Sequence, residues 1–241
     1  MLELHQFRHS ALCLKVRMVL QAKGLTYRTV EITPGIDQIS IFLLSGQRQV
    51  PVLVDGDTVL ADSSAIARYL ETREPLPALI PTDPQHAAQL HLIEDWADTT
   101  LAYASRSALV EAAAKDPELR AALLPEGLPS LVRQAMGTLP AHWIGGFGEL
   151  LNPGRQANLL ASLEQIASAV QVRSWLVGEA MSIADLAVAA QLSLLRFPSS
   201  ADVSLVGKGV PGFGDHPRLQ PLFEWRDQLE FKLMEQSLEE V

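Results

Sequence analysis

Cysteine, basic charge and long apolar runs are all scarce in this chain. Cys13 is the only cysteine, so no disulfide can form within the chain. A lone cysteine is typical of a reducing compartment, and we expect a cytoplasmic protein. The net charge is −9 and no basic run occurs, which argues against a nucleic-acid partner. The apolar runs are far shorter than a membrane span. The N-terminus lacks a charged region followed by an apolar one, so we expect no signal peptide. We therefore expect no membrane partner.

Patterns for metals and phosphates are also missing. His5 and His9 are four residues apart, but they straddle an expected strand and loop. His86 and His91 fall on different faces of an expected helix. The glycine-rich stretches 145–148 and 207–209 are too short for a phosphate loop. We expect no metal site.

Residues 1–74 alternate between short apolar runs and helical patterns. Strands are expected at 1–7, 27–32, 52–54 and 58–60, and helices at 12–23 and from 62 onward. The segment up to residue 44 reads as irregular or weakly helical, and the Asp-Gly pair at 55–56 predicts a hairpin. This order predicts a small mixed sheet with a parallel first crossover and two antiparallel last strands.

The rest of the chain is helical in pattern. Residues 75–84 hold four prolines and are expected to be a linker. Residues 85–241 show no convincing strand. Helices are expected at 85–115, 155–172, 183–195 and 218–238, and turn-rich or irregular segments at 137–154 and 197–217. The sequence therefore predicts an α/β N-terminal domain followed by an all-α domain.

Ser10 and Cys13 mark the point where the first strand leads into the first helix. Unpaired backbone N–H groups and the positive end of the helix dipole favour an anion there, and in particular a thiolate. Ser10 also suits a simple N-cap, which is the structural alternative. The helix terminus is expected to lower the pKa of Cys13, which would make this thiol a competing reactive group.

Two further segments combine structural signals with ligand-binding ones. Val50 and Pro51 precede a strand, and a cis bond there would leave the Val50 backbone free to pair with a peptide-like ligand. Asp62 and Ser63 open a helix, where capping alone explains them. The same terminus also suits an α-amino acid group, with its carboxylate on the N–H groups and its ammonium on Asp62.

The helical part carries patterns that we interpret as structural. Ser182 and Asp185 form a capping box for a buried helix. Glu94, Asp95 and Asp98 make an acidic helix face that we expect to be solvated. Trp96 and Tyr103 are expected in the core, and Arg106 on a solvated face.

Together these patterns resemble the glutathione transferase superfamily. The resemblance rests on Val50-Pro51, on Asp62-Ser63, on the Gly178-Glu179-x-x-Ser182-Ile183-Ala184-Asp185 run and on Asp215-His216-Pro217-Arg218-Leu219. It covers nearly the whole chain, and the serine at the first active-site position is similar to theta- and zeta-like members. It implies a thioredoxin-like glutathione-binding domain at 1–74, a linker at 75–84, and an all-helical domain at 85–241 that forms the electrophile pocket.

The resemblance also implies roles for individual residues. Ser10 would donate a hydrogen bond to the glutathione sulfur and stabilise its thiolate, with Cys13 as the alternative. Val50 would pair its backbone with the cysteinyl part of glutathione. Asp62 and Ser63 would hold the γ-glutamyl end, and Arg48 or Gln49 the glycyl carboxylate. Pro51, Ser182 and Asp185 would be structural.

The implied activity is conjugation of glutathione, as co-substrate, to a small hydrophobic electrophile. A cytoplasmic homodimer that acts in detoxification would fit this resemblance. One alternative is a glutathione-dependent isomerase or a thiol transferase that reduces disulfides on the same fold. A non-catalytic binding protein of the same family is the other alternative.

Overall fold

The computed structural model describes residues 1–34, 36–124 and 153–239. Its N-terminal part contains four strands and three helices. In chain order these are β1 (Leu2–Gln6), α1 (Ala11–Ala22), β2 (Tyr27–Glu31), α2 (Gln38–Ser45), β3 (Val52–Asp55), β4 (Thr58–Ala61) and α3 (Ser63–Arg73). The segment before residue 45, for which the sequence predicted weak or no helix, forms the regular helix α2, which ends at the left-handed residue Gly46.

The four strands form one mixed sheet in the order β2-β1-β3-β4. β1 and β2 are parallel, and β3 pairs antiparallel with both β1 and β4. The predicted parallel crossover and terminal hairpin are therefore confirmed. The cis bond that the sequence allowed is present between Val50 and Pro51, and a second one joins Leu76 to Pro77.

The described C-terminal part is helical. Its elements are α4 (Pro84–Trp96), the π-helix η1 (Ala97–Leu101), α5 (Ala102–Lys115), α6 (Pro117–Ala122), α9 (Pro153–Val172), α10 (Ile183–Leu195), the 3-10 turn η3 (Pro217–Leu219) and α11 (Gln220–Glu239). Among the helices of these ranges, none is both long enough and apolar enough to cross a bilayer. The predicted turn-rich segment 137–154 lies almost entirely outside the described residues.

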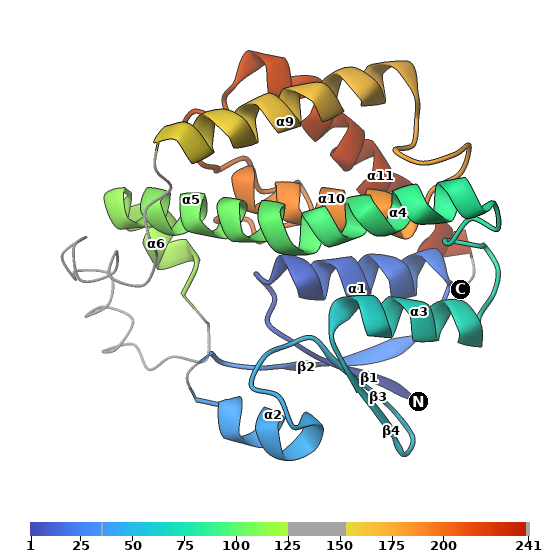
Figure 1. The fold of residues 1–241 in the computed structure, drawn as a ribbon. Coiled ribbons are helices and arrows are strands. Elements are labelled where there is room, and N and C mark those ends of the chain that lie inside the picture. Colours follow the sequence, from blue (N-terminus) through green and yellow to red (C-terminus); the bar gives the residue numbers. More distant parts are fainter. Residues whose placement is uncertain (35, 125–152, 240–241) are drawn as a thin grey trace.

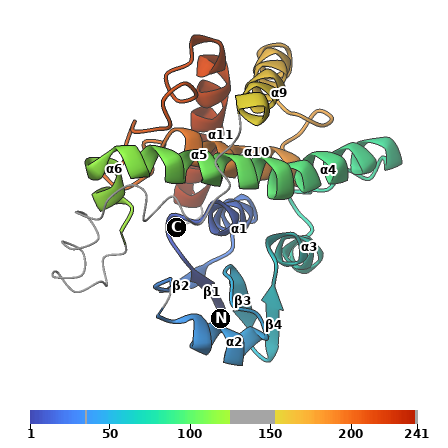
Figure 2. The ribbon, with the colours of Figure 1, turned by 60° about the vertical axis from the view of Figure 1, so that its left-hand side comes forward.

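The helices form layers above the sheet. Figure 1 shows α1 and α3 between the sheet and the helical part, and α2 on the opposite side of the sheet. Figure 2 shows α4 and α5 as one long rod that passes in front of α10 and α11. α10 is buried along its whole length, as its apolar sequence predicted, and it packs directly on α1. One continuous cluster of buried side chains therefore joins both parts of the chain.

The start of α10 is fixed by the predicted capping box. The Asp185 carboxylate accepts hydrogen bonds from the Ser182 backbone N–H at 2.8 Å and from its hydroxyl at 2.7 Å. Its other oxygen accepts from the Leu176 N–H at 2.8 Å. The segment before α4 is anchored nearby, because the Leu79 carbonyl accepts from the Ile183 N–H at 3.0 Å.

Candidate active site

Three predicted segments leave the sheet at the same edge. His5 of β1 pairs with Val52 of β3, and Val52 in turn pairs with Ala61 of β4. The loop that follows β1, the residues before β3 and the residues after β4 therefore begin side by side (Figure 1). This edge carries Ser10, Val50 and Asp62.

Ser10 is the N-cap of α1. Its backbone is extended, with φ −82° and ψ 121°, and its Oγ accepts a hydrogen bond from the Cys13 N–H at 3.4 Å. The cap uses the oxygen as an acceptor, so the hydroxyl hydrogen remains able to donate. The side chain is half-buried and lines a cleft. Capping and donation to a ligand are therefore compatible roles for Ser10.

Cys13 points away from this surface. Its side chain has no exposed area, and burial raises the pKa of its thiol, although the Ser10 hydrogen bond and the Arg17 charge oppose that effect. The prediction that the helix terminus would lower this pKa is wrong, because the loss of hydration outweighs the helix dipole. Cys13 occupies the first helical turn as a small apolar residue.

Asp62 and Ser63 start α3 in an unusual conformation. Asp62 is exposed and has a φ of 84°, which is rare for a residue other than glycine. Its Oδ1 accepts from the Ser64 N–H at 3.0 Å and from the Ala65 N–H at 2.9 Å. Both bonds use one oxygen, which leaves Oδ2 without a hydrogen bond in the described part of the chain. Ser63 is 3% exposed.

The remaining predicted ligand residues lie before β3. Val50 is half-buried and Pro51 is buried, whereas Arg48 and Gln49 are exposed. The Arg48 guanidinium carbon lies 5.8 Å from the centre of the Phe42 ring, so this side chain leans towards α2.

A cleft of about 520 Å³ opens beside Ser10. Its walls are the β1–α1 loop, the first two turns of α1, the end of β2 and the segment after α10. Of the residues predicted to contact a ligand, only Ser10 lines this cleft; Arg48, Gln49, Val50, Asp62 and Ser63 do not. Ser10 therefore lies between the cleft and the sheet edge that carries the other residues.

The cleft is lined by polar and charged side chains to which the sequence patterns gave no ligand-binding role. Arg8 and His9 approach Asp202, with nitrogen–oxygen distances of 3.2 and 3.8 Å. Burial lowers the pKa of His9, which favours the neutral ring. Phe197 and Pro198 supply apolar surface. The cleft therefore combines charged and apolar side chains, whereas the resemblance implied a hydrophobic electrophile.

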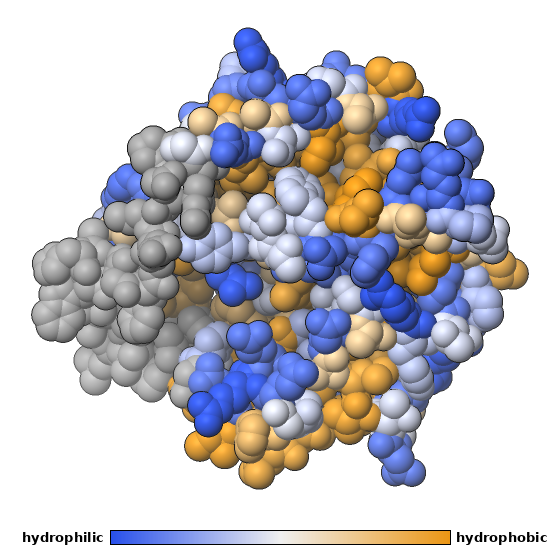
Figure 3. Space-filling view, in the orientation of Figure 1, coloured by the Kyte–Doolittle hydropathy of each residue, from blue (hydrophilic) through white to orange (hydrophobic). Residues whose placement is uncertain are grey.

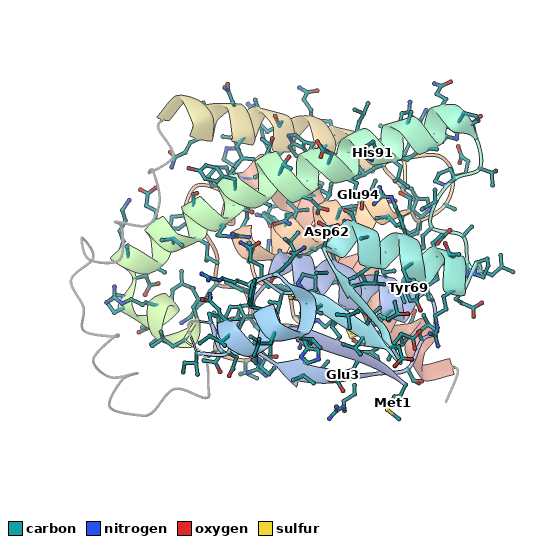
Figure 4. The ribbon with its side chains drawn as sticks, turned by 60° about the horizontal axis from the view of Figure 1, so that its bottom comes forward. Met1, Glu3, Asp62, Tyr69, His91 and Glu94 are labelled. Carbon is teal, nitrogen blue, oxygen red and sulfur yellow. The ribbon has the colours of Figure 1, made fainter. Side chains whose placement is uncertain are left out.

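Behind the edge, a buried charge cluster joins the four helical elements α1, α3, α4 and η1. Lys15 of α1 has no exposed side-chain area, and its ammonium donates to Glu94 at 2.7 Å, to Asp98 at 2.6 Å and to the Ser64 hydroxyl at 3.0 Å. Arg68 adds a bond to Glu94 at 2.8 Å. Figure 4 shows Glu94 next to the start of α3, where Asp62 lies.

This cluster corrects the predicted solvated acidic face. Glu94 is 1% exposed, Asp98 is only partly exposed, and Asp95 alone faces solvent as predicted. Periodicity placed the three acids on one helix surface, but a buried lysine on another helix covers that surface. Together the contacts fix α1 and the start of α3 against α4.

A second hollow lies between η1 and α9. It has a volume of about 460 Å³ and is lined by Trp96, Tyr103 and Leu159, among others. Tyr103 is 45% exposed, so the prediction that it lies in the core is wrong. Trp96 is half-buried against the core, and Arg106 is exposed as predicted. Within the described ranges, no group of three potential metal ligands comes together.

Comparisons with known proteins support the family assignment. Residues 4–78 match the model of the glutathione S-transferase N-terminal domain. A stringent starvation protein A homolog from Pasteurella multocida (strain Pm70) is 33% identical over 117 residues, which are 46% of this chain and 55% of that protein. The chain thus spans about half the length of that relative.

Longer similarities cover both parts of the chain. FtsZ-localized protein A from Caulobacter vibrioides (strain NA1000 / CB15N) is 28% identical over 199 residues, 80% of this chain and 77% of that protein. The crystal structure of a glutathione S-transferase from Rhodospirillum rubrum F11 covers 95% of this chain and 88% of its own, with 25% identity and a TM-score of 0.66. Residues 4–78 therefore match the glutathione S-transferase N-terminal domain family, and the described parts of the chain together have the glutathione S-transferase fold.

Proposed function

We propose that this protein binds glutathione along the edge of the sheet and conjugates it, through its sulfur, to a small electrophile in the adjoining cleft. The observation that carries the proposal is the position of Ser10. Its hydroxyl can donate, it caps the helix α1, and it lines the cleft. The competing thiol of Cys13 is buried.

Each part of glutathione has a proposed partner on this edge. The Val50 backbone pairs with the cysteinyl unit, and the Asp62 Oδ2 atom accepts from the γ-glutamyl ammonium. Ser63 and the N-terminus of α3 hold the γ-glutamyl carboxylate. Arg48 or Gln49 binds the glycyl carboxylate. The exposure of Arg48, Gln49 and Asp62 supports these assignments, because a ligand can reach their side chains.

Ser10 activates the bound thiol by stabilising its thiolate. A hydrogen bond to a charged group contributes about 1.5–3 kcal/mol, which equals roughly one to two pKa units. The helix N-terminus adds about 0.3–1 kcal/mol. A thiol with an ordinary pKa of about 8.5 is then largely ionised at neutral pH. The thiolate forms a sulfur–carbon bond, the leaving group departs with the electron pair of the broken bond, and the thiol proton passes to solvent.

The experiment compares the wild type with Ser10→Ala and Cys13→Ala. Each protein is assayed for glutathione binding, for conjugation of an aryl halide and for disulfide reduction. We expect Ser10→Ala to lower the conjugation rate constant about 10- to 100-fold, because one hydrogen bond to the thiolate is lost. Cys13→Ala is expected to retain activity. Loss of activity in Cys13→Ala alone would reverse this assignment and favour thiol transfer.

A non-catalytic role is the second candidate. It is favoured by the name of the long relative, FtsZ-localized protein A, which describes a location rather than a reaction. Failure of the wild-type protein to bind glutathione would support it and would contradict conjugation, isomerisation and thiol transfer alike.

We also propose that the protein acts as a homodimer in the cytoplasm, where conjugation would serve detoxification. Exposed apolar residues gather on and beside α2, at the lower left of Figure 3. They are Ile36, Ile39, Phe42, Leu43 and Leu44. Such a patch is typical of a protein–protein contact. Sedimentation velocity checks the dimer, and a monomer at micromolar concentration would contradict it.

A further inference from the structure

Arg17 lies on the same face of α1 as Ser10. The residues Ser10, Leu14 and Arg17 are spaced i, i+4 and i+7, which places them in one row along a helix. All three line the cleft. The row thus presents, in order, the proposed activating hydroxyl, an apolar side chain and a guanidinium.

The Arg17 guanidinium reaches back towards the active end of the helix. It donates to the Arg8 carbonyl at 3.3 Å and to the Gln6 Oε1 atom at 2.7 Å. The Arg8 carbonyl lies in the loop that leads directly to Ser10. These bonds use two of the five N–H donors of the guanidinium. Both acceptors are neutral, and no carboxylate in the described part of the chain pairs with Arg17.

The other charged groups of the cleft already have partners. Arg8 forms an ion pair with Asp202, and His9 also lies near Asp202, at 3.8 Å. Glu31 on the β2 wall accepts one hydrogen bond from the Gln6 amide at 3.1 Å and one from the Arg8 N–H at 2.6 Å. Glu31 is exposed, so water screens its charge more than that of the half-buried Arg17.

The positive charge of Arg17 acts on two groups of neighbouring elements, the half-buried Tyr27 and the buried Glu230. Burial raises the pKa of the Tyr27 hydroxyl and of the Glu230 carboxyl, and the charge of Arg17 opposes the rise at both. These residues lie on β2 and α11, so the field of Arg17 spans the wall between the two parts of the protein. A negative group in the cleft would lie in this field.

We propose that the cleft selects electrophiles that carry a carboxylate, with the carboxylate bound by Arg17 and the reacting carbon beside Ser10. The planar fork of a guanidinium fits the two oxygens of a carboxylate. The guanidinium folds back to the loop before Ser10, so the two binding groups of the protein are near each other. A substrate that contacts both therefore carries its carboxylate close to its reacting carbon. This inference rests on the proposed glutathione transfer and adds the substrate class.

Iodoacetate and iodoacetamide form the test pair, because they share the reacting carbon and differ in charge. In both, the sulfur–carbon bond forms, the carbon–iodine bond breaks, iodide leaves with the electron pair, and the thiol proton passes to solvent. For each electrophile, the rate of conjugation with glutathione in the presence of the protein is divided by the rate in its absence. We expect this ratio to favour iodoacetate about 10- to 100-fold in the wild type.

Three variants locate the origin of the preference. Arg17→Gln is expected to reduce it at least about tenfold, and Arg17→Lys to restore part of it, because lysine keeps the charge without the fork. Glu31→Gln removes a negative charge that repels a bound carboxylate. This variant is expected to maintain or increase the preference for iodoacetate. Arg106→Gln, on an exposed position of α5, is the matched control and is expected to leave it unchanged.

A second measurement needs no variant and covers the case in which Arg17→Gln does not fold. Glycolate and glycolamide, which cannot react, are compared as competitive inhibitors of iodoacetamide conjugation by the wild type. We expect glycolate to bind at least about tenfold more tightly. The carboxylate site is overturned if the protein accelerates both electrophiles by the same rate ratio and glycolate and glycolamide inhibit equally. That outcome would leave glutathione transfer intact. Turnover of neither electrophile, without glutathione binding, would overturn the proposed function and the carboxylate site together.

Discussion

Asp62 combines a backbone role with a proposed ligand role. Its positive φ costs energy for any residue with a side chain, and its Oδ1 atom caps α3 by two hydrogen bonds. Asparagine tolerates positive φ and caps helices about as well as aspartate, but it carries no charge. Substitution at this position can therefore separate the two roles.

We predict that Asp62→Asn keeps the free energy of unfolding within about 0.5 kcal/mol of the wild type, whereas Asp62→Ala lowers it by about 1–2 kcal/mol. Both are expected to weaken glutathione binding about tenfold or more, because the ammonium loses a charged partner. Urea unfolding and titration calorimetry measure the two effects. Glutathione binding by Asp62→Asn at wild-type strength would show that Asp62 is only a cap.

Helix α1 is held in place by a buried charge. Lys15 bonds to Glu94 and Asp98, and to the Ser64 hydroxyl at the start of α3. Removing one partner of a buried ion cluster leaves the others buried without compensation. The orientation of α1, and with it the position of Ser10, therefore depends on Lys15.

Lys15→Met is predicted to lower the free energy of unfolding by about 3–5 kcal/mol. The matched control is Lys115→Met, because Lys115 is exposed and pairs with Glu111 four residues earlier at 2.6 Å. Its effect is expected to stay within about 0.5 kcal/mol. Chemical denaturation measures both, and equal losses in the two variants would contradict a special role for the buried cluster.

Helix α10 begins at a carboxyl group that is buried and titrates unusually. Burial raises the pKa of Asp185 from 3.8 to about 6, even though three hydrogen bonds favour the charged form. The folded state therefore binds this proton more tightly than the unfolded state does. The resulting stabilisation is present below about pH 4 and is lost as the pH rises towards 6.

We predict that the wild type loses about 3 kcal/mol of stability relative to Asp185→Asn between about pH 3 and about pH 7, because asparagine does not titrate. Urea unfolding at a series of pH values tests this difference. If the wild type instead gains stability relative to the variant as pH rises, the hydrogen bonds outweigh burial and the predicted direction is wrong.

Both parts of the protein share one core. Buried side chains continue from Leu4 in β1 through Val16 in α1 to Leu186 in α10 without a break. Separating the parts would expose this apolar surface to water, at about 25 cal/mol per Å². The sheet and the helical part are therefore expected to depend on each other for stability.

We predict that the whole chain unfolds in one cooperative transition. All four tryptophans lie beyond residue 84, so their fluorescence reports the helical part, while hydrogen exchange of β1 and β3 amides reports the sheet. The two probes should give the same midpoint in urea. Clearly separated midpoints would contradict the shared core.

Local patterns predicted much of this structure because local forces dominate there. The hairpin at Asp55-Gly56, the N-cap at Ser10 and the capping box at Ser182 depend on backbone requirements within a few residues. The same patterns failed for Cys13, Glu94 and Tyr103. In each case the environment is set by residues distant in the chain, and no local signal reports it.

The amino-acid sequence determines the features that rest on short motifs and on periodicity. These are the resemblance to glutathione transferases, the order of strands and helices, and the segments that meet at the sheet edge. The cleft is not among these features. Gln6, Arg17, Glu31 and Asp202 become neighbours only when β1, β2, α1 and the segment after α10 pack together. Burial and charge compensation depend on that packing. They decide that Cys13 is buried, that Lys15 is paired with Glu94 and Asp98, and that the hydrogen-bond acceptors of Arg17 are neutral.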